Sequence, residues 1–247
     1  GTASWAFVER ALSFSFLHPR RKAGGIAEAW STKRGTGDAP RPALRLPPAS
    51  RGCYTAGMQM ESVLVGAFGV NCLVLWDDPN QAVVVDPGAE ADAIEAVLAR
   101  HRLTVAAYWL THGHIDHVSA VGDLTAKRPA PVYIHAADAT WAFTAANRYP
   151  PYVRPPSRPD TLETLEDGRV LTVGPIAARV LHTPGHTPGG VCFLLEAEKR
   201  LLSGDTLFQG SVGRTDLPGG DTETLMRSLS RLLDLADDIQ VHPGHGP

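Results

Sequence analysis

The sequence lacks any apolar run of roughly 18 residues, the length that a membrane-spanning helix needs. It has three cysteines, Cys53, Cys72 and Cys192, and none of them stands in a CxxC pair. An odd number of scattered cysteines argues against a disulfide framework and against a cysteine zinc finger. No internal repeat or low-complexity tract follows Met60. We therefore expect neither an integral membrane protein nor a disulfide-stapled or repetitive chain.

A strong net charge is also absent. The net charge is −3. Hydrophobic residues make up 43% of the chain and charged residues 20%, which is an ordinary globular composition. Such a charge gives no general attraction to nucleic acid. Its distribution is uneven, because residues 1–59 hold nine Lys or Arg against three Asp or Glu (+6), whereas residues 60–247 hold fourteen against twenty-three (−9).

Residues 1–59 differ from the rest of the chain. The stretch from Lys33 to Arg51 is rich in Gly, Pro and Arg and shows no period of 2 or 3.6, so it buries too little apolar surface to offset its ordering entropy. Three interpretations stay open: a targeting peptide, a disordered tail, or residues upstream of a true start at Met58 or Met60. We favour the third. We therefore expect a basic leader or non-native extension over 1–59 and one folded domain over 60–247.

From Ser62 onward the pattern predicts alternating strands and helices. Asp221 is the expected N-cap of an amphipathic helix marked by leucines four and three residues apart. A loop with five prolines is expected over 149–159, and with Phe208–Gln209 it is a candidate for a pocket wall. The order favours a layered α/β domain with antiparallel or mixed sheets. The expected strands are 62–65, 70–76, 81–85, 105–110, 132–134, 170–173, 177–181, 191–195, 200–202 and 239–241, and the expected helices are 92–100, 118–124, 136–147 and the segment carrying Leu225, Leu229, Leu232 and Leu233.

Nine of the ten histidines lie at His101 or later, and three of them fall in one segment, 111–117. Alternate side chains of an extended run share a face, so His112 and His114 can reach one ion together. Asp116 and His117 lie past the start of the next turn and can face a second ion. Imidazole nitrogens and carboxylate oxygens are ligands that Zn²⁺ accepts.

Three more candidate ligands follow at predicted strand ends. His186 lies in a Thr-Pro-Gly-His-Thr-Pro-Gly-Gly segment, Asp205 in Ser-Gly-Asp-Thr, and His245 in Pro-Gly-His-Gly. Glycine and proline beside each of them allow tight turns that aim a side chain inward. One such residue alone is typical of a turn, but all three together with the first segment indicate a metal centre.

The pattern His112-x-His114-x-Asp116-His117, followed by His186, Asp205 and His245, resembles the metallo-β-lactamase superfamily. The resemblance covers residues 60–247. It implies a four-layer αββα sandwich, with two mixed sheets between outer helices and the metals at one edge.

For the seven residues, the resemblance implies two sites for divalent metal ions, zinc before iron or manganese. The first site would be formed by three histidines, His112, His114 and His186. The second would be formed by one aspartate and two histidines, Asp116, His117 and His245. Asp205 would bridge both ions. Asp116 and Asp205 would be the catalytic residues, together with a hydroxide that bridges the metals.

Local segments narrow the resemblance to compact glyoxalase II-like hydrolases. These segments are 68–72 (Phe-Gly-Val-Asn-Cys), 85–88 (Val-Asp-Pro-Gly), 211–216 (Ser-Val-Gly-Arg-Thr-Asp) and 243–247. Zinc β-lactamases usually carry a cysteine where this chain has Asp205, which weakens an antibiotic-hydrolysing interpretation. Full-length glyoxalase II adds a C-terminal helical domain that holds glutathione. The sequence stops at Pro247, so we expect either that this domain is absent, as in the compact branch, or that the sequence is a fragment that ends early.

The resemblance therefore implies a hydrolase for a small acylthiol such as S-lactoylglutathione. One alternative is an iron-dependent persulfide dioxygenase of the same fold, and another is a phosphodiester hydrolase acting on RNA, which the −9 charge of residues 60–247 disfavours. We expect a cytoplasmic protein with neither nucleic acid nor membrane as a partner.

Single residues outside the motif carry weaker expectations. Asp86 is interpreted as an acid that orients a ligand histidine, or else as part of an Asp-Pro-Gly turn. Arg214 and Asp216 are expected to form a buried ion pair. His135, His182 and His242 are expected to be packing or supporting residues, and Cys72 and Cys192 to be small core residues.

Overall fold

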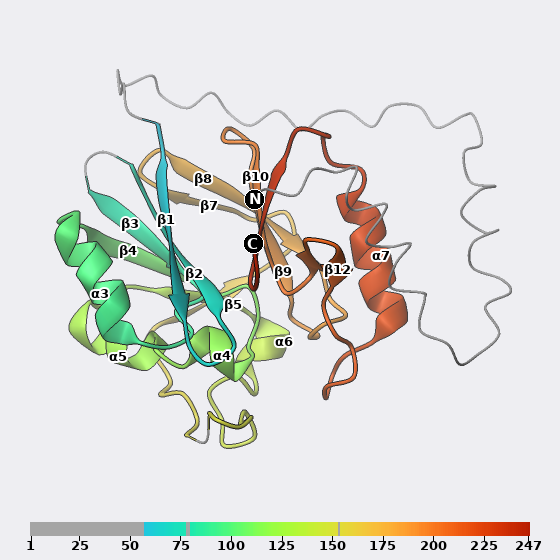
Figure 1. Ribbon diagram of the computed structural model, residues 1–247, viewed down its shortest axis with the longest axis horizontal. Coiled ribbons are helices and arrows are strands. Elements are labelled where there is room, and N and C mark those ends of the chain that lie inside the picture. The colour runs from blue at the N-terminus through green and yellow to red at the C-terminus, as the bar shows by residue number, and fades with distance from the viewer. Residues whose placement is uncertain (1–56, 78–79, 153) are drawn as a thin grey trace, which may run out of the picture.

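The computed structural model describes residues 57–77, 80–152 and 154–247 (Figure 1). The leader expected over 1–59 lies outside these residues, except for 57–59 at the entrance to the first strand. No described helix is long and apolar enough to cross a bilayer.

The first sheet has six strands in the order β1-β2-β3-β4-β5-β6. The pairings β1–β2 and β2–β3 are antiparallel and the remaining three are parallel. Strand β6 was not predicted, because it is a short edge strand with a single fully buried residue, Leu165. The strands are β1 Gln59–Val65, β2 Val70–Asp77, β3 Gln81–Val85, β4 Thr104–Trp109, β5 Val132–His135 and β6 Leu162–Leu165.

The second sheet has five strands in the order β13-β10-β9-β8-β7. Only the β10–β13 pairing is parallel, so both sheets are mixed, as expected. A small hairpin, β11 with β12, was not predicted, since two-residue strands carry no period. The strands are β7 Val170–Val173, β8 Ile176–His182, β9 Val191–Leu195, β10 Arg200–Gly204, β11 Leu207–Phe208, β12 Ser211–Val212 and β13 Gln240–Pro243.

Five helices are described. Helix α7 begins after Asp221, whose side chain accepts a hydrogen bond from the Thr224 N–H at 2.8 Å, so the predicted N-cap is confirmed. Its leucines are buried against the second sheet, and each contributes about 1.5–3 kcal/mol. The helices are α3 Ala91–Arg100, α4 Ile115–Val118, α5 Val121–Lys127, α6 Ala136–Ala139 and α7 Thr222–Leu232.

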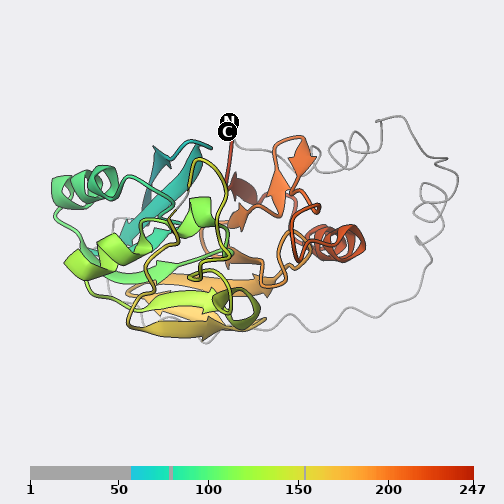
Figure 2. The ribbon, with the colours of Figure 1, turned by 90° about the horizontal axis from the view of Figure 1, so that it is seen from below.

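Alternating side chains along the central strands produce four layers. In β2, Leu75 packs between the two sheets while Val74 packs under α3 and α5. In β9, Phe193 packs between the sheets while Leu194 packs under α7. Successive strand residues point to opposite faces, so strands covered on both sides read as continuous apolar runs. Figures 1 and 2 both show α3 and α5 on one side of the sheets and α7 on the other, which confirms the αββα sandwich.

Two predicted helices were wrong in extent. The helix predicted over 118–124 is interrupted, because the Ala120 N–H bonds to the Pro87 carbonyl at 3.0 Å. The helix predicted over 136–147 ends at Ala139. The chain then runs through turns, in which the Asn147 amide donates to the carbonyls of Gly113 at 2.8 Å and Ala142 at 2.6 Å. Tertiary hydrogen bonds therefore replace those of a continuing helix.

Candidate metal centre

Five segments that carry candidate ligands or their supports follow the carboxyl ends of strands from both sheets. Loops after β3, β4, β8, β10 and β13 bear Asp86, the 112–117 segment, His186, Asp205 and His245 in turn. A hydrogen bond from the Val191 N–H to the Thr111 carbonyl, 2.8 Å long, ties a loop of the first sheet to a strand of the second. One edge of the sandwich thus gathers residues that are far apart in the sequence.

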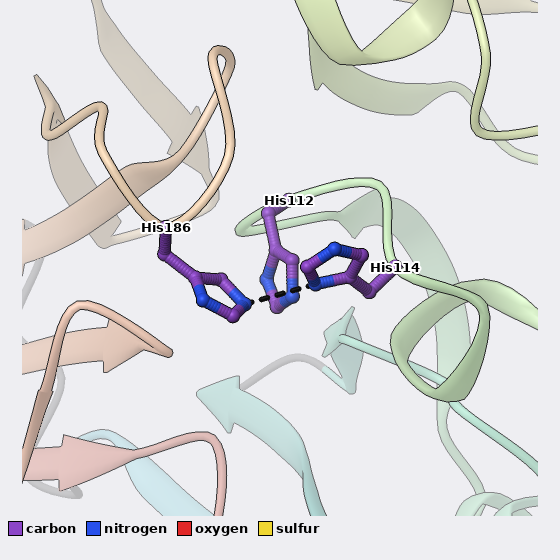
Figure 3. Close-up of side chains that lie close together, drawn as sticks. All are labelled: His112, His114 and His186. Carbon is purple, nitrogen blue, oxygen red and sulfur yellow. Dashed lines mark hydrogen bonds between the residues drawn. The ribbon is translucent and has the colours of Figure 1, made fainter. Parts of the chain in front are cut away.

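The first group consists of His112, His114 and His186, whose ligand atoms lie within 4.8 Å of one another. Figure 3 shows the three rings pointing toward one another, with His114 Nδ1 2.9 Å from His186 Nε2. His112 Nε2 is buried and has no hydrogen-bond partner among the described residues. An unpartnered buried nitrogen is costly, and a cation at the centre of the group would satisfy it.

The second group consists of Asp116, His117 and His245. His117 Nε2 lies 3.2 Å from His245 Nε2, and Asp116 Oδ2 lies 3.4 Å from the same His245 nitrogen. The first turn of α4 places Asp116 and His117, whereas His245 follows β13. The two triplets expected from the sequence are therefore brought together as two separate groups.

Asp205 lies between the two groups. Its Oδ2 is 3.5 Å from His186 Nε2 in the first group and 3.5 Å from His245 Nε2 in the second, and its Oδ1 is 3.4 Å from His117 Nε2. Asp205 Oδ1 is buried with no hydrogen-bond partner in the described part of the chain. A carboxylate in this place has one oxygen available for each of two cations.

The outer ring nitrogens are held by oxygen acceptors. His186 Nδ1 lies 2.7 Å from the Arg214 carbonyl, and His245 Nδ1 lies 3.0 Å from the Phe68 carbonyl. A carbonyl only accepts, so both rings donate from Nδ1, and the Nε2 atom of each ring is the one that faces the groups. His112 Nδ1 is held in the same way, 3.0 Å from the Thr111 hydroxyl. Such contacts orient metal-binding imidazoles, and the nitrogen and oxygen donors suit zinc, iron or manganese.

Asp86 supports both the loop and a histidine. It accepts hydrogen bonds from the Thr111 N–H at 2.7 Å and the Thr111 hydroxyl at 2.6 Å, and its Oδ2 lies 3.0 Å from His117 Nδ1. It has φ of 47°, an unusual value for a residue with a side chain. The histidine-orienting interpretation of Asp86 is thus the one that the structure supports.

We expect Asp86→Ala to weaken metal binding at the second group about 10- to 100-fold, because His117 loses the carboxylate that orients it. Competition with a fluorescent chelator would measure both affinities. Asp123→Ala, which removes an exposed carboxylate on α5, is the control. Equal affinities in the two variants would contradict the orienting role.

Two glycines leave room for the groups. A Cβ on Gly244 would lie 2.4 Å from Asp205 Oδ1 and 2.8 Å from a carbon of the His117 ring. A Cβ on Gly88 would lie 1.7 Å from the Asp116 carbonyl oxygen. Glycine beside these residues therefore provides space for close packing in addition to freedom to turn.

Asn71 holds the last ligand segment in place. Its side-chain amide donates to the carbonyls of Pro243 at 3.1 Å and Gly246 at 2.8 Å, on both sides of His245. Its backbone N–H bonds to the Gly244 carbonyl at 2.8 Å. The sequence drew attention to this asparagine only as part of the 68–72 segment.

Asp138 is a functional residue that sequence reasoning missed. It is fully buried on α6 and accepts hydrogen bonds from the Gly113 N–H (2.9 Å), the Thr187 hydroxyl (2.7 Å) and the Gly189 N–H (2.7 Å). Burial raises the pKa of Asp138, and the three donors oppose that shift. Gly113 lies between two candidate ligands and Thr187 follows a third, so Asp138 joins the two loops of the first group. Nothing in the surrounding Ala-Ala-Asp-Ala-Thr segment signals this role.

The two groups differ in proton affinity. Burial lowers the pKa of His112 well below its usual value and that of His114 to about 3. Burial alone would also lower the pKa of His117 and His245. The carboxylates of Asp205 and Asp116 outweigh it, so the pKa of His117 is raised well above its usual value and that of His245 is raised to about 9.

Without metal, His117 and His245 therefore carry protons at pH 7, whereas a metal ion requires their lone pairs. We expect the second group to release up to about two protons on metal binding at pH 7, and its affinity to rise with pH until pH exceeds about 9. Titration calorimetry at pH 7 in buffers of different ionisation enthalpy measures the release. Heats that do not depend on the buffer would contradict this assignment.

The other singled-out residues lie outside the two groups. Arg214 and Asp216 do form an ion pair, with distances of 2.7 and 2.8 Å, but it is exposed and not buried as expected, because the loop after β12 faces solvent. His135 and His182 stack with ring centroids 4.2 Å apart. Cys72 and Cys192 are fully buried, which confirms them as core residues.

A cleft of about 840 Å³ opens beside the metal groups. His114, Asp116, Asp205 and His245 are among the residues that line it, so both groups are accessible from it. Tyr149 and Phe208 line it, which confirms the candidate pocket wall in part.

Comparison with known proteins agrees with this geometry. Residues 65–245 match the metallo-beta-lactamase superfamily. Hydroxyacylglutathione hydrolase GloC of Haemophilus influenzae is 35% identical over 201 residues, covering 76% of this chain and 91% of that protein.

Three solved structures are similar as well. The BLEG-1 B3 metallo-beta-lactamase is 39% identical (TM-score 0.71; 76% of this chain and 92% of that one). TTHA1623 in a di-iron-bound form is 39% identical (TM-score 0.68; 76% and 92%). ETHE1 from Myxococcus xanthus is 28% identical (TM-score 0.62; 76% of each chain).

These relatives share the αββα fold but carry names of different activities, so they support the enzyme class more firmly than a substrate. They include hydroxyacylglutathione hydrolases, which is consistent with a glyoxalase II-like branch. From the match over 65–245 and from the two histidine–aspartate groups at the sheet edge, this chain belongs to the metallo-beta-lactamase superfamily of metal-dependent hydrolases.

Proposed function

We propose that this protein hydrolyses a thioester of a small acylthiol, such as S-lactoylglutathione, with two divalent ions, zinc first, held by the two groups. The observation that carries the proposal is the position of Asp205, between the first group at His186 and the second at His117 and His245. The similarity to a hydroxyacylglutathione hydrolase supports the substrate class.

When bound, divalent ions would lower the pKa of a coordinated water toward about 7 and so supply a nucleophile at neutral pH. Asp205 would set the separation of the ions and orient that water. Asp116 lines the cleft beside His245 and would help to hold the second ion. The C–S bond breaks, the acyl carbon takes the hydroxyl group and the sulfur leaves. A thiolate is a weak base, so the site needs no strong general acid.

An iron-dependent persulfide dioxygenase is the second candidate. The observation that favours it is the similarity to ETHE1 from Myxococcus xanthus, and nitrogen and oxygen donors such as those of the two groups also accept iron.

Metal content and activity measured on one sample distinguish the candidates. We expect protein purified without added metal to hold about two zinc ions per chain and to hydrolyse S-lactoylglutathione. One iron per chain, no thioester hydrolysis and oxygen uptake with glutathione persulfide would replace the proposal by the dioxygenase. Hydrolysis of a chromogenic cephalosporin alone would overturn both candidates. His114→Ala, prepared in the same way, controls for a contaminating enzyme.

A further inference from the structure

Aromatic side chains flank the metal groups on both sides of the cleft. The Trp141 ring lies 5.6 Å from the His114 ring, and the Phe208 ring lies 6.2 Å from the His245 ring, measured between centroids. Both aromatic residues line the cleft. A carbonyl group placed at the metals would therefore have an aromatic surface on each side.

Two further aromatic residues line the cleft and are exposed to solvent. Phe68 and Tyr149 are 41% and 44% exposed, and they are two of only four large hydrophobic side chains exposed in the described part of the chain. Their rings pack edge to face at 5.8 Å. The Tyr152 hydroxyl accepts a hydrogen bond from the Ala67 N–H at 3.1 Å, which holds the proline-rich loop against the β1–β2 turn. Exposed apolar surface concentrated at a cleft is typical of a ligand-binding surface.

The cleft also has one cation without a counter-ion. Of the arginines that line it, Arg214 is paired through two hydrogen bonds with Asp216. Arg148 is exposed, and its side chain has no ion pair or hydrogen bond with a described residue. The only acids in the lining, Asp116 and Asp205, belong to the metal groups. Arg148 is therefore free to receive one anionic group of a substrate.

We propose that the substrate is an acylthiol with a bulky apolar or aromatic acyl group and one anionic group, the first held by the aromatic walls and the second by Arg148. This proposal rests on the proposed thioester hydrolysis and narrows it. A lactoyl group is small and polar and would leave most of the aromatic surface uncovered. Burial of an aromatic ring against that surface contributes in proportion to the apolar area removed from water.

Five thioesters test the proposal on the metal-loaded full chain. Phenylacetyl and acetyl thioesters of 3-mercaptopropionate and of 2-mercaptoethanol vary the acyl group and the charge of the thiol part. The 4-carboxyphenylacetyl thioester of 2-mercaptoethanol places the charge on the acyl part instead. We expect kcat/KM for phenylacetyl to exceed that for acetyl by about tenfold or more, and at least one anionic probe to exceed its neutral counterpart.

Two variants identify the residues responsible. Tyr149→Ala is expected to reduce the phenylacetyl-to-acetyl ratio, and Arg148→Gln to reduce the anionic-to-neutral ratio about fivefold. Arg154→Gln removes the same charge from the same loop, outside the cleft lining, and both ratios should stay at the wild-type values.

Two results would overturn this inference and leave thioester hydrolysis standing. One is that the wild type hydrolyses phenylacetyl and acetyl thioesters with equal kcat/KM. The other is that Arg148→Gln leaves the anionic-to-neutral ratio unchanged. Absence of hydrolysis for every probe and for S-lactoylglutathione would overturn both.

Discussion

Asp205→Ala is expected to lower thioester turnover at least about a thousandfold, because preorganised charge at a two-metal site provides the largest share of the rate. Asp205 contacts His186 in one group and His117 and His245 in the other. In the proposed arrangement, removing its carboxylate would take one ligand from each ion. We therefore expect the metal content to fall from two ions per chain together with kcat, measured on the same sample.

Asp205→Asn separates charge from shape, since the amide keeps the volume and loses the negative charge. It should lose nearly as much activity as alanine. Asp237→Ala removes an exposed carboxylate that belongs to neither candidate metal group, and this control variant should keep full activity. Circular dichroism that matches wild type for all three variants would show that the fold survives. Near-full turnover by Asp205→Ala would remove the basis of the proposed function.

Asp138→Ala is expected to destabilise the metal-free protein by about 3 kcal/mol or more, because three buried donors lose a charged acceptor at once. For a domain of this size, that corresponds to a Tm lower by about 6–12 °C. The donors are Gly113, Thr187 and Gly189, on the two loops that carry the first histidine group. We therefore also expect weaker metal binding at that group, with the second group less affected.

Thermal unfolding and chelator competition test the two effects of Asp138 separately. Asp138→Asn turns an NH2 group toward one of the three donors and should give an intermediate loss of stability. Asp160→Ala removes an exposed carboxylate and should change Tm little. Unchanged Tm with both metal affinities intact in Asp138→Ala would show that the loops hold their positions without it.

The sequence by itself determined the family and the grouping of candidate ligands. Four candidate ligands, His112, His114, Asp116 and His117, lie within six consecutive residues. Local geometry alone therefore separates the first two from the last two, on the two sides of one turn. The apolar residues of 81–85 and 191–195 predicted strands, and the structure shows that both strands are covered on both faces. Proline and glycine beside His186, Asp205 and His245 marked tight turns. All of this information is local.

Only the tertiary structure decided which distant residues support the site. Asp138 meets Gly189 across 51 residues and Asn71 meets Gly246 across 175, and neither carries a local pattern that signals its partner. Another long-range contact, from the Asn147 amide to the Gly113 carbonyl, overrode local helix propensity where the helix predicted over 136–147 ends at Ala139. Local sequence patterns could also not predict that the Arg214–Asp216 ion pair is exposed, or that the Arg148 side chain lines the cleft without an ion pair to a described residue. Burial and hydrogen-bond satisfaction are properties of packed segments, so they appear only when the two sheets come together.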